Sequence, residues 1–304
     1  MTFGVMFHHF HSHVHKKGQG SISKNELKKI LISLKKKYIL NNADDYVKKI
    51  LKKKITYKDI CLTFDDGLKC QIDIALPILK EFKIKAFFFV YNGAFKNNPD
   101  NLEIFRYFRN TKYQNIKFFY QDFFKHMKLF FINDFLKYKK KFTNKYLNQY
   151  KFYSIEDRQY RFCRDKILSK DSYETLMFKI MKKKKFNYKL AIKKLFMNRT
   201  DIKKLIKEKH IIGLHSSTHP VNLPNLLYKD QMREYKNNML FIKKFTKSRP
   251  LSMSHPFGRY NKNTLKILKN IGIKIGFLSY KKKKISSLLE IPRLDHVELI
   301  QKLR

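Results

Sequence analysis

The chain has 304 residues and a formal net charge of +44, with 68 Lys and Arg against 24 Asp and Glu. Hydrophobic residues still make up 43% of it, so a buried core is expected and a purely basic tail is excluded. Trp is absent and Gly numbers only 9, which disfavours β-propellers and Gly-rich phosphate-binding loops. The length suits one large domain or two ordinary ones, and single α/β barrels are common at this size.

Short apolar runs and helix signals alternate in the N-terminal third of the chain. A helix is expected to begin at Ser21 or Ser23, because Glu26 stands at capping-box spacing from Ser23. The other elements expected here are strands over 3–8, 59–64 and 86–90 and a helix over 71–82. Strand, helix and strand at this spacing predict a parallel sheet with right-handed crossovers.

The alternation is lost over 96–200, where Lys, Phe and Tyr dominate at helical spacing. We interpret 96–200 as a helical insertion with an aromatic core face and a solvated Lys face; a surface that stacks on nucleic acid is the alternative. Alternation then returns, with helices over 201–208, 229–245 and 264–269 and strands over 211–215, 251–254, 273–279 and 290–294. The sequence therefore predicts a (β/α) barrel over 1–95 and 201–304. The insertion is expected at the rim of the active face, where it selects the substrate or acts as a lid.

The three cysteines are too few and too scattered for a disulfide framework or a thiolate zinc site, and they favour a reducing compartment: Cys61, Cys70 and Cys163. The first residues lack the basic segment and cleavage site of a signal peptide. No apolar run approaches the roughly 20 residues that cross a membrane. We therefore expect a cytoplasmic protein, at most peripheral at the inner face of the membrane.

The positive charge has two interpretations. It is mostly Lys, it extends through every segment, and it accompanies abundant Ile, Phe, Tyr and Asn, which is the profile of an AT-rich coding bias. No nucleic-acid recognition module accompanies it, so no specific nucleic-acid partner is expected. Attraction to an anionic membrane or to a phosphate-bearing substrate is the other interpretation.

Polar side chains follow the predicted strands where each strand ends: His8, Asp65 with Asp66, His215 with His219, His255, and Arg293 with Asp295. Catalytic groups gather at the C-terminal strand ends of a parallel barrel. Two His four residues apart and one carboxylate would leave open positions on Zn²⁺ or a similar ion. Taken separately, the two His can be ordinary surface or core residues, and the paired Asp can form a turn or a helix cap.

Three of these motifs, in this order, resemble the NodB-homology polysaccharide deacetylases, carbohydrate esterase family four: Thr63-Phe64-Asp65-Asp66-Gly67, His215-Ser216-Ser217-Thr218-His219-Pro220 and Pro256-Phe257-Gly258. Val5-Met6-Phe7-His8 resembles the Met-Tyr-His strand near the start of many members, and Pro77-Ile78-Leu79-Lys80 before 86–90 matches the segment after the first motif. The resemblance covers about 1–95 and 201–304. It implies a deformed (β/α) barrel of the NodB-homology type, here with a large helical insertion.

The resemblance also implies roles for individual residues. Asp66, His215 and His219 would bind a divalent metal, Zn²⁺ or alternatively Co²⁺, while Asp65 would take a proton from the attacking water. The backbone N–H of Phe257 or Gly258 would bind the oxyanion, in a substrate-contacting segment that includes His255 and Pro256. His8 is our choice for the general acid, and the alternatives are His9, His11 and His255.

The sequence departs from the family pattern at two places. Ser254 stands where the family has an Arg that orients the base. Arg293 would take over this task from the next strand end, or it is a surface Arg. We find no clear match to the late Leu-x-His motif of the family, although Asp295-His296 lies near the right place.

These residues predict a metal-dependent hydrolase that removes acetyl from an N-acetylated sugar. The substrate is expected to be nucleotide-linked, lipid-linked, or an oligosaccharide precursor of a surface glycan. Two alternatives are an O-acetyl esterase on carbohydrate and an inactive barrel that serves as a basic binding module for nucleic acid or membrane. Intact Asp65, Asp66, His215 and His219 argue against the inactive module.

Overall fold

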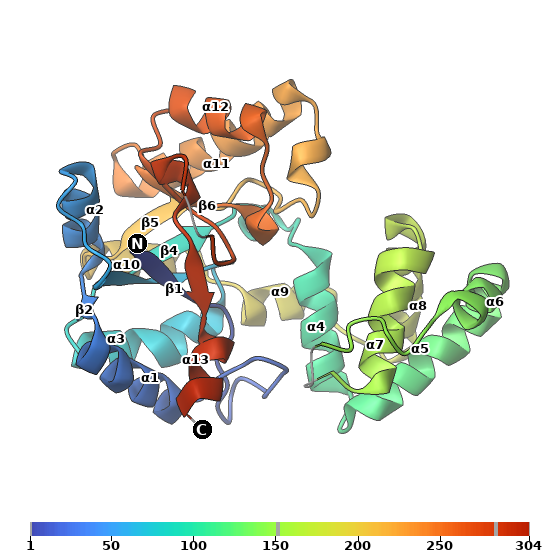
Figure 1. The fold of residues 1–304 in the computed structure, drawn as a ribbon. Coiled ribbons are helices and arrows are strands. Elements are labelled where there is room, and N and C mark those ends of the chain that lie inside the picture. The colour runs from blue at the N-terminus through green and yellow to red at the C-terminus, as the bar shows by residue number, and fades with distance from the viewer. Residues whose placement is uncertain (1, 150–152, 283–284, 304) are drawn as a thin grey trace. The chain divides into compact units, whose positions relative to one another are not determined.

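The computed structural model describes residues 2–149, 153–282 and 285–303, and the chain forms two compact units (Figure 1). The barrel unit comprises Met1–Asp100 and Ile192–Arg304, and the helical unit comprises Asn101–Ala191. The segment 96–200 expected as an insertion thus contains all of the helical unit. Its first and last residues, 96–100 and 192–200, belong to the barrel unit.

The barrel unit alternates strands with helices along the chain. Its strands are β1 (Phe3–Phe7), β2 (Ile39–Leu40), β3 (Asp59–Phe64), β4 (Phe87–Val90), β5 (Ile211–Leu214), β6 (Ser252–Ser254), β7 (Ile275–Phe277) and β8 (Arg293–Asp295). Its helices include α1 (Lys24–Lys37), α2 (Ala43–Leu51), α3 (Leu76–Glu81), α10 (Arg199–Lys207), α11 (Tyr228–Thr246), α12 (Lys262–Asn270) and α13 (His296–Leu303). Short helical turns are the π-helix η1 (Gln71–Ala75) and the 3₁₀ turns η2 (Ala94–Lys96), η4 (Leu223–Asn225), η5 (Pro256–Gly258) and η6 (Leu288–Glu290).

The strands form one parallel sheet in the order β7-β6-β5-β4-β3-β1-β8, and β2 pairs with the start of β3. A parallel bridge between Phe277 and Ile291 joins β7 to the segment before β8, so the sheet is a nearly closed barrel. The predicted deformed (β/α) barrel is confirmed. Because Phe7 lies beside Phe64 in the sheet, the residues that follow β1 and β3 emerge at the same edge.

Most predicted elements are present within a residue or two of their expected bounds. The capping box of α1 is formed by Ser23 and Glu26. The helix expected over 71–82 begins instead as the π-helix η1 and continues as α3. Among the described strands and α-helices of the barrel unit, three were not predicted: β2, α2 and α13.

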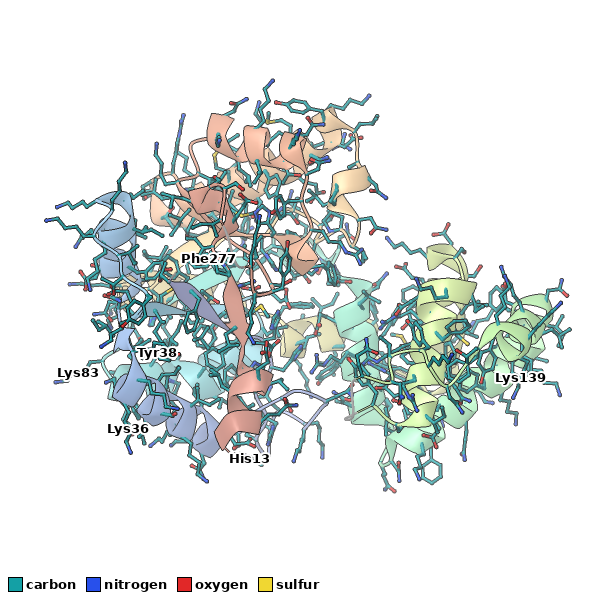
Figure 2. All side chains as sticks on the ribbon, in the orientation of Figure 1. His13, Lys36, Tyr38, Lys83, Lys139 and Phe277 are labelled. Carbon is teal, nitrogen blue, oxygen red and sulfur yellow. The ribbon has the colours of Figure 1, made fainter. Side chains whose placement is uncertain are left out.

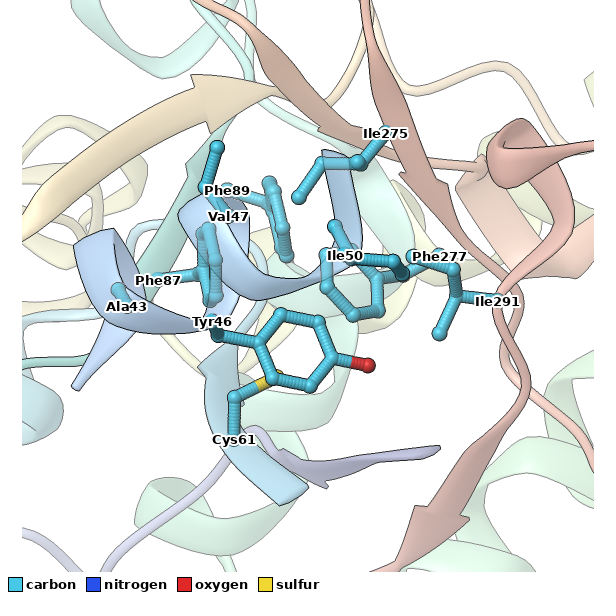
Figure 3. Packing of buried hydrophobic residues seen from close by; sticks show 10 residues of the cluster. All are labelled: Ala43, Tyr46, Val47, Ile50, Cys61, Phe87, Phe89, Ile275, Phe277 and Ile291. Carbon is cyan, nitrogen blue, oxygen red and sulfur yellow. The ribbon is translucent and has the colours of Figure 1, made fainter. Parts of the chain in front are cut away.

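Helix α2 contributes to the core at the end of the barrel where strands begin (Figure 3). Its first N–H, from Ala43, donates to the carbonyl of Lys85, which directly precedes β4. Its Tyr46 and Ile50 are buried among side chains of β3, β4 and β7 in a cluster with Val47, Cys61, Phe87, Phe89, Ile275, Phe277 and Ile291. Each such large apolar side chain stabilises the fold by about 1.5–3 kcal/mol on burial. The opposite end, where strands finish, is left for polar groups.

The helical unit is built on aromatic packing. It contains α4 (Asn101–Lys112), α5 (Ile116–Phe130), α6 (Ile132–Lys141), α7 (Ile155–Phe162), the π-helix η3 (Cys163–Ile167) and α8 (Lys170–Lys183), and α9 (Tyr188–Leu195) runs back into the barrel unit. The Tyr160 ring lies 5.3 Å from that of Phe119 and 4.9 Å from that of Phe123, edge to face. Edge-to-face pairs contribute roughly 0.5–1.5 kcal/mol beyond area burial.

Lysines occupy the outer surface of both units. In Figure 2, Lys36 and Lys83 project outward from the barrel unit and Lys139 from the helical unit, whereas Phe277 lies inside the barrel. Among the described residues, no helix combines the length and the apolar character that crossing a membrane requires.

Candidate active site

The loop after β3 carries the two adjacent carboxylates of the site in an unusual backbone conformation. Asp66 and Gly67 both have left-handed backbone, with φ of 74° and 63°. This conformation costs a non-glycine residue about 1–2 kcal/mol. Gly67 has an additional reason to be glycine, since a Cβ there would lie 3.2 Å from Cγ1 of Val90. The sharp turn places both Asp65 and Asp66 in the buried end of the barrel.

The His-x-x-x-His loop after β5 is held by helix α11. The carboxylate of Glu234 accepts hydrogen bonds from the N–H groups of Ser217 at 2.9 Å and Thr218 at 2.8 Å. One turn further along the helix, the Asn238 side-chain oxygen accepts from the N–H of His215 at 2.8 Å. These bonds fix a loop in which Ser216 and His219 have positive φ.

Asp66, His215 and His219 converge on one point. The Asp66 Oδ1 atom lies 3.2 Å from His215 Nε2 and 3.5 Å from His219 Nε2. One ligand atom from each of the three residues lies within 4.8 Å of the others, and all three residues are buried. The structure thus brings together the three residues expected to bind the metal.

The other ring nitrogens define the tautomers of these imidazoles. His215 Nδ1 lies 2.9 Å from the carbonyl oxygen of Ser254, and His219 Nδ1 lies 3.0 Å from Oδ2 of Asp100. Both oxygens are acceptors only, so each Nδ1 carries the proton and donates it. Each Nε2 then has its lone pair directed toward Asp66, as in a metal-binding histidine.

A divalent cation fits this arrangement. Within the described part of the chain, the buried Oδ1 of Asp66 makes no hydrogen bond. A buried carboxylate facing two imidazole lone pairs lacks a positive partner, and two nitrogens with one oxygen suit a divalent metal with open coordination positions.

Asp65 is held by a buried guanidinium. Arg293 donates from its two terminal nitrogens to Oδ1 and Oδ2 of Asp65 at 2.7 and 2.6 Å, and the Ser254 hydroxyl lies 3.1 Å from Oδ2. Burial raises the pKa of Asp65, but the charge of Arg293 outweighs it and lowers the pKa overall. The carboxylate is therefore ionised and fixed in orientation.

Arg293 occupies space that a glycine provides. Gly4 of β1 lies beside Arg293 of β8, and a Cβ on Gly4 would lie 3.2 Å from the Arg293 Cγ. The guanidinium also donates to the Ser254 hydroxyl at 2.7 Å. Ser254, which stands where the family has its Arg, is therefore one of the partners of the Arg that enters from β8.

His8 is the candidate acid that lies nearest the carboxylates. Its Nε2 is 3.9 Å from Oδ2 of Asp65 and 3.9 Å from Oδ2 of Asp66, and its side chain is 28% exposed. Gln71 of the π-helix donates to the carbonyls of both His8 and Asp65, at 3.0 and 2.7 Å. Among the alternatives, His11 is paired with the Ser21 hydroxyl at 3.0 Å and His9 is half-buried.

The third motif corrects one expectation. His255 is fully buried, donates from Nε2 to the carbonyl of Leu289 at 2.8 Å, and packs its ring against Tyr260. Burial lowers the pKa of His255 to about 4. A substrate cannot reach this ring, so the structure does not place His255 as a general acid or a substrate contact.

The following residues face the site differently. Pro256 is buried, whereas Phe257 is 41% exposed and its ring centroid lies 4.7 Å from that of His219. Phe257 has a φ of 54°, outside the usual range for a bulky residue. The Gly258 N–H donates to the carbonyl of His255 at 2.9 Å, whereas the Phe257 N–H has no hydrogen-bond acceptor among the described residues. Of the two N–H groups considered for the oxyanion, that of Phe257 is available.

Leu294-Asp295-His296 has the spacing of the late Leu-x-His motif, for which no clear match was found in the sequence. In the structure His296 is buried, with Nδ1 3.2 Å from the carbonyl of Met6 and Nε2 2.8 Å from that of Gly20. Its ring stacks on Phe7. Burial lowers the pKa of His296. His296 therefore supports β1, the strand that directly precedes His8.

Several residues that build the site were not found from the sequence: Gln71, Asp100, Glu234 and Asn238. Glu234 and Asn238 carry a weak signal, since they are polar residues four apart on the buried face of an amphipathic helix. Asp100 has none, because it lies in the segment that was expected to be insertion.

A parallel barrel that presents a buried carboxylate and two imidazoles at its strand ends, beside a second carboxylate fixed by Arg, is that of a metal-dependent hydrolase. The model of the family described as polysaccharide deacetylase matches residues 40–108 and 166–276. The chain belongs to the polysaccharide deacetylase family. It is a metal-dependent hydrolase that removes acetyl groups from carbohydrate.

Solved structures share the fold at low sequence identity. The Streptococcus pyogenes deacetylase PplD, in complex with acetate, is 14% identical with a TM-score of 0.58, over 100% of this chain and 98% of that one. IcaB from Ammonifex degensii is also 14% identical with a TM-score of 0.58, over 96% and 90%. A de-N-acetylase from Aggregatibacter actinomycetemcomitans gives the same identity and TM-score over 100% and 99%. No curated protein sequence matches significantly.

Proposed function

We propose that Asp66, His215 and His219 hold one divalent ion, Zn²⁺ in the first instance, and that the barrel hydrolyses the acetamide of an N-acetylated sugar. The observation that carries this proposal is the buried Asp66 Oδ1, which faces two imidazole Nε2 atoms and has no hydrogen bond within the described residues. Two nitrogens and one oxygen also suit Co²⁺, which we expect to substitute.

A bound divalent ion would lower the pKa of water and polarise the acetyl carbonyl. Asp65 accepts the proton of the attacking water. Its lowered pKa makes it a weak base alone, which is sufficient for a water that has been made acidic. Arg293 keeps both oxygens of Asp65 in one orientation, so the base needs no reorganisation when the water attacks.

The remaining groups handle the charge and the leaving amine. The Phe257 N–H donates to the oxygen that becomes negative as water adds to the carbonyl carbon. His8 gives a proton to the sugar nitrogen as the C–N bond breaks, which yields acetate and a free amine. A proton donor matters more for an amine than for an alcohol, so the position of His8 favours amide hydrolysis over the O-acetyl esterase alternative.

Metal analysis combined with acetate release tests this proposal. The purified protein should contain about one divalent ion, lose activity with a chelator, and regain it with Zn²⁺ or Co²⁺. Asp66→Ala, His215→Ala and His219→Ala should each lose most of the metal, because two protein ligands are too few. Normal metal content in all three folded variants would refute the site. Acetate release from O-acetyl but not N-acetyl sugars would refute the amide assignment.

We also propose an anionic membrane as a peripheral partner, and a lipid-linked or nucleotide-linked sugar in the cytoplasm as the substrate. Support comes from the junction of α5 and α6, where apolar side chains are 44–69% exposed among exposed lysines: Leu129, Phe130, Ile132 and Leu136 beside Lys125, Lys128 and Lys137. Such a surface suits an anionic interface. The protein should sediment with vesicles that contain phosphatidylserine and not with pure phosphatidylcholine vesicles. Equal binding to both, or recovery in an exported fraction, would contradict the proposal.

A further inference from the structure

A carboxylate outside the family motifs supports one of the metal-binding histidines. Asp100 accepts a hydrogen bond from His219 Nδ1 at 3.0 Å, and its side chain is only 10% exposed. Its own N–H donates to the hydroxyl of Tyr91 at 3.1 Å, and Tyr91 is 1% exposed. The Tyr91 ring in turn packs 5.5 Å from the imidazole of His219. Asp100 is therefore fixed on both sides.

The two imidazoles of the site are anchored by different means. His215 donates to the carbonyl of Ser254, a backbone atom of β6 that every variant retains. His219 depends on a side chain and has left-handed backbone, with φ of 56°. A hydrogen bond to a carboxylate is roughly twice as strong as one to a neutral acceptor, and it makes the opposite ring nitrogen a better electron donor.

We propose that Asp100 is a positioning residue of the metal centre, one that holds His219 as the Nδ1–H tautomer and strengthens Nε2 as a ligand. This inference rests on the proposed metal role of Asp66, His215 and His219. Asp100 touches neither the substrate nor the reacting atoms, so its effect reaches the reaction through His219.

Asp100 also lies where the chain leaves the barrel unit for the helical unit. It is the last residue of the first barrel segment, and Asn101 begins the helical unit. After the helical unit, the returning chain also reaches the metal loop, because the Met197 N–H donates to the carbonyl of Gly67 at 2.8 Å and Phe196 forms a bridge with Leu68. Both connections are therefore attached to the loops that carry metal ligands.

The test is a direct measurement of metal affinity. Apo protein competes with a chromophoric chelator for Zn²⁺, without any substrate. Asp100→Ala should weaken Zn²⁺ binding by about 10–100-fold, the usual range for loss of such a partner. Asp100→Asn, which is nearly the same size, should weaken it less, and Asp100→Glu should recover part of the affinity. With Co²⁺ bound, the visible spectrum of Asp100→Ala should shift from that of the parent.

Asp73→Ala is a matched control. Asp73 accepts from His15 Nε2 at 2.8 Å, so the variant removes the same kind of pair away from the metal ligands. It should leave Zn²⁺ affinity unchanged. If the parent binds Zn²⁺ and both Asp100→Ala and the near-isosteric Asp100→Asn, folded by circular dichroism, bind equally well, the inference is wrong. A parent that binds no metal would instead refute the proposed function beneath it.

Discussion

The barrel unit and the helical unit use different residues to fold a strongly basic chain. All nine Gly and all seven Pro lie in the barrel unit, whereas 24 of the 46 Phe and Tyr lie in the 91 residues of the helical unit. Gly and Pro serve tight turns, and the barrel needs such turns at its strand ends. The helical unit, whose sequence contains no Gly or Pro, is stabilised by packed aromatic rings instead. The candidate catalytic and metal-binding residues thus lie in the unit whose backbone turns sharply.

The charge, in contrast, hardly distinguishes the two units. The helical unit has 23 Lys and Arg against 8 Asp and Glu, and the barrel unit has 45 against 16 over more than twice the length. The excess per residue is therefore similar in both. A dedicated polyanion-binding unit would concentrate it, so the even distribution favours coding bias as its main origin.

The largest effect should come from a single carboxylate in the barrel unit. Asp65→Asn should keep its metal and lose about 10²–10⁴-fold in acetate release, the range for a removed general base. Asp122→Asn is the matched change in the helical unit, where Asp122 accepts from the Tyr113 hydroxyl at 2.9 Å. It should leave the rate within about twofold. Steady-state kinetics at saturating Zn²⁺ measure both, and a parent rate in Asp65→Asn would assign the base elsewhere.

The next prediction concerns His8 and compares two substrates that differ in their leaving group. His8→Ala should reduce acetamide cleavage by about 10²-fold and largely spare an activated aryl acetate, whose phenolate leaves unprotonated. His11→Ala, on the same loop, should affect neither substrate. Comparable losses on the two substrates in His8→Ala would indicate a structural or metal-related role, and a selective loss in His11→Ala would move the acid to His11.

Acid should destabilise the barrel unit through His210. This buried imidazole accepts the N–H of Ala86 on Nδ1 at 3.0 Å, and burial, assisted by the charge of Lys85, lowers its pKa to about 4. The folded pKa lies below the unfolded value of about 6.5, because the fold favours the neutral imidazole. The contribution of neutral His210 to stability is therefore fully present above pH 6.5. This stability is lost as pH falls from 6.5 to 4, by on the order of 3 kcal/mol.

Urea unfolding at pH 7, 5.5 and 4 measures this loss. His210→Asn keeps a neutral acceptor near the Ala86 N–H and cannot take up a proton there, so its stability should depend less on pH over this interval. A pH dependence identical to that of the parent would show that other groups determine the acid sensitivity of the barrel unit.

The smallest effect concerns charge in the helical unit. If its lysines attract a phosphate-bearing substrate, KM should rise severalfold with ionic strength, since exposed charges are screened over about 8 Å at physiological salt. Changing Lys182, Lys183 and Lys185 to Glu should flatten this dependence more than the same change at Lys35, Lys36 and Lys83 of the barrel unit. A KM that does not change with ionic strength would favour the interpretation of the helical unit as a lid that only excludes water. Equal flattening would indicate a general field from both units.

The sequence predicts the central strands and the three motifs because their signals are local. The run over 59–64 consists mainly of apolar and β-branched residues and ends at Asp65-Asp66-Gly67, and β3 has these bounds. By contrast, β2 has only two residues and depends on pairing with β3, a tertiary contact that no window of sequence contains. Helix α2 does have a local signal that was not used, because Ala43, Tyr46, Val47 and Ile50 recur at i, i+3, i+4 and i+7.

The residues of the candidate site also divide into those with a local sequence signal and those without one. Asp66, His215 and His219 are found from motif spacing, whereas their supports are distant in the chain. Arg293 meets Asp65 at a separation of 228 residues, and Asp100 meets His219 at a separation of 119. The Arg293 pairing was anticipated only through the resemblance, with a surface Arg as the alternative, and no local pattern marks the pairing of Asp100 with His219. Deriving Asp100 would have required knowing that 96–100 belongs to the barrel unit.

The left-handed backbone in the site has an evolutionary consequence. Asp66, Ser216, His219 and Phe257 all have φ between 54° and 74°, where glycine or asparagine would fit with less strain. Selection for stability and selection for activity therefore oppose each other at these four positions. A library selected only for solubility should accumulate Gly and Asn there, and a descendant that loses its substrate should change at these positions early. Unchanged residues at all four under such selection would show that the local strain is already relieved by their contacts.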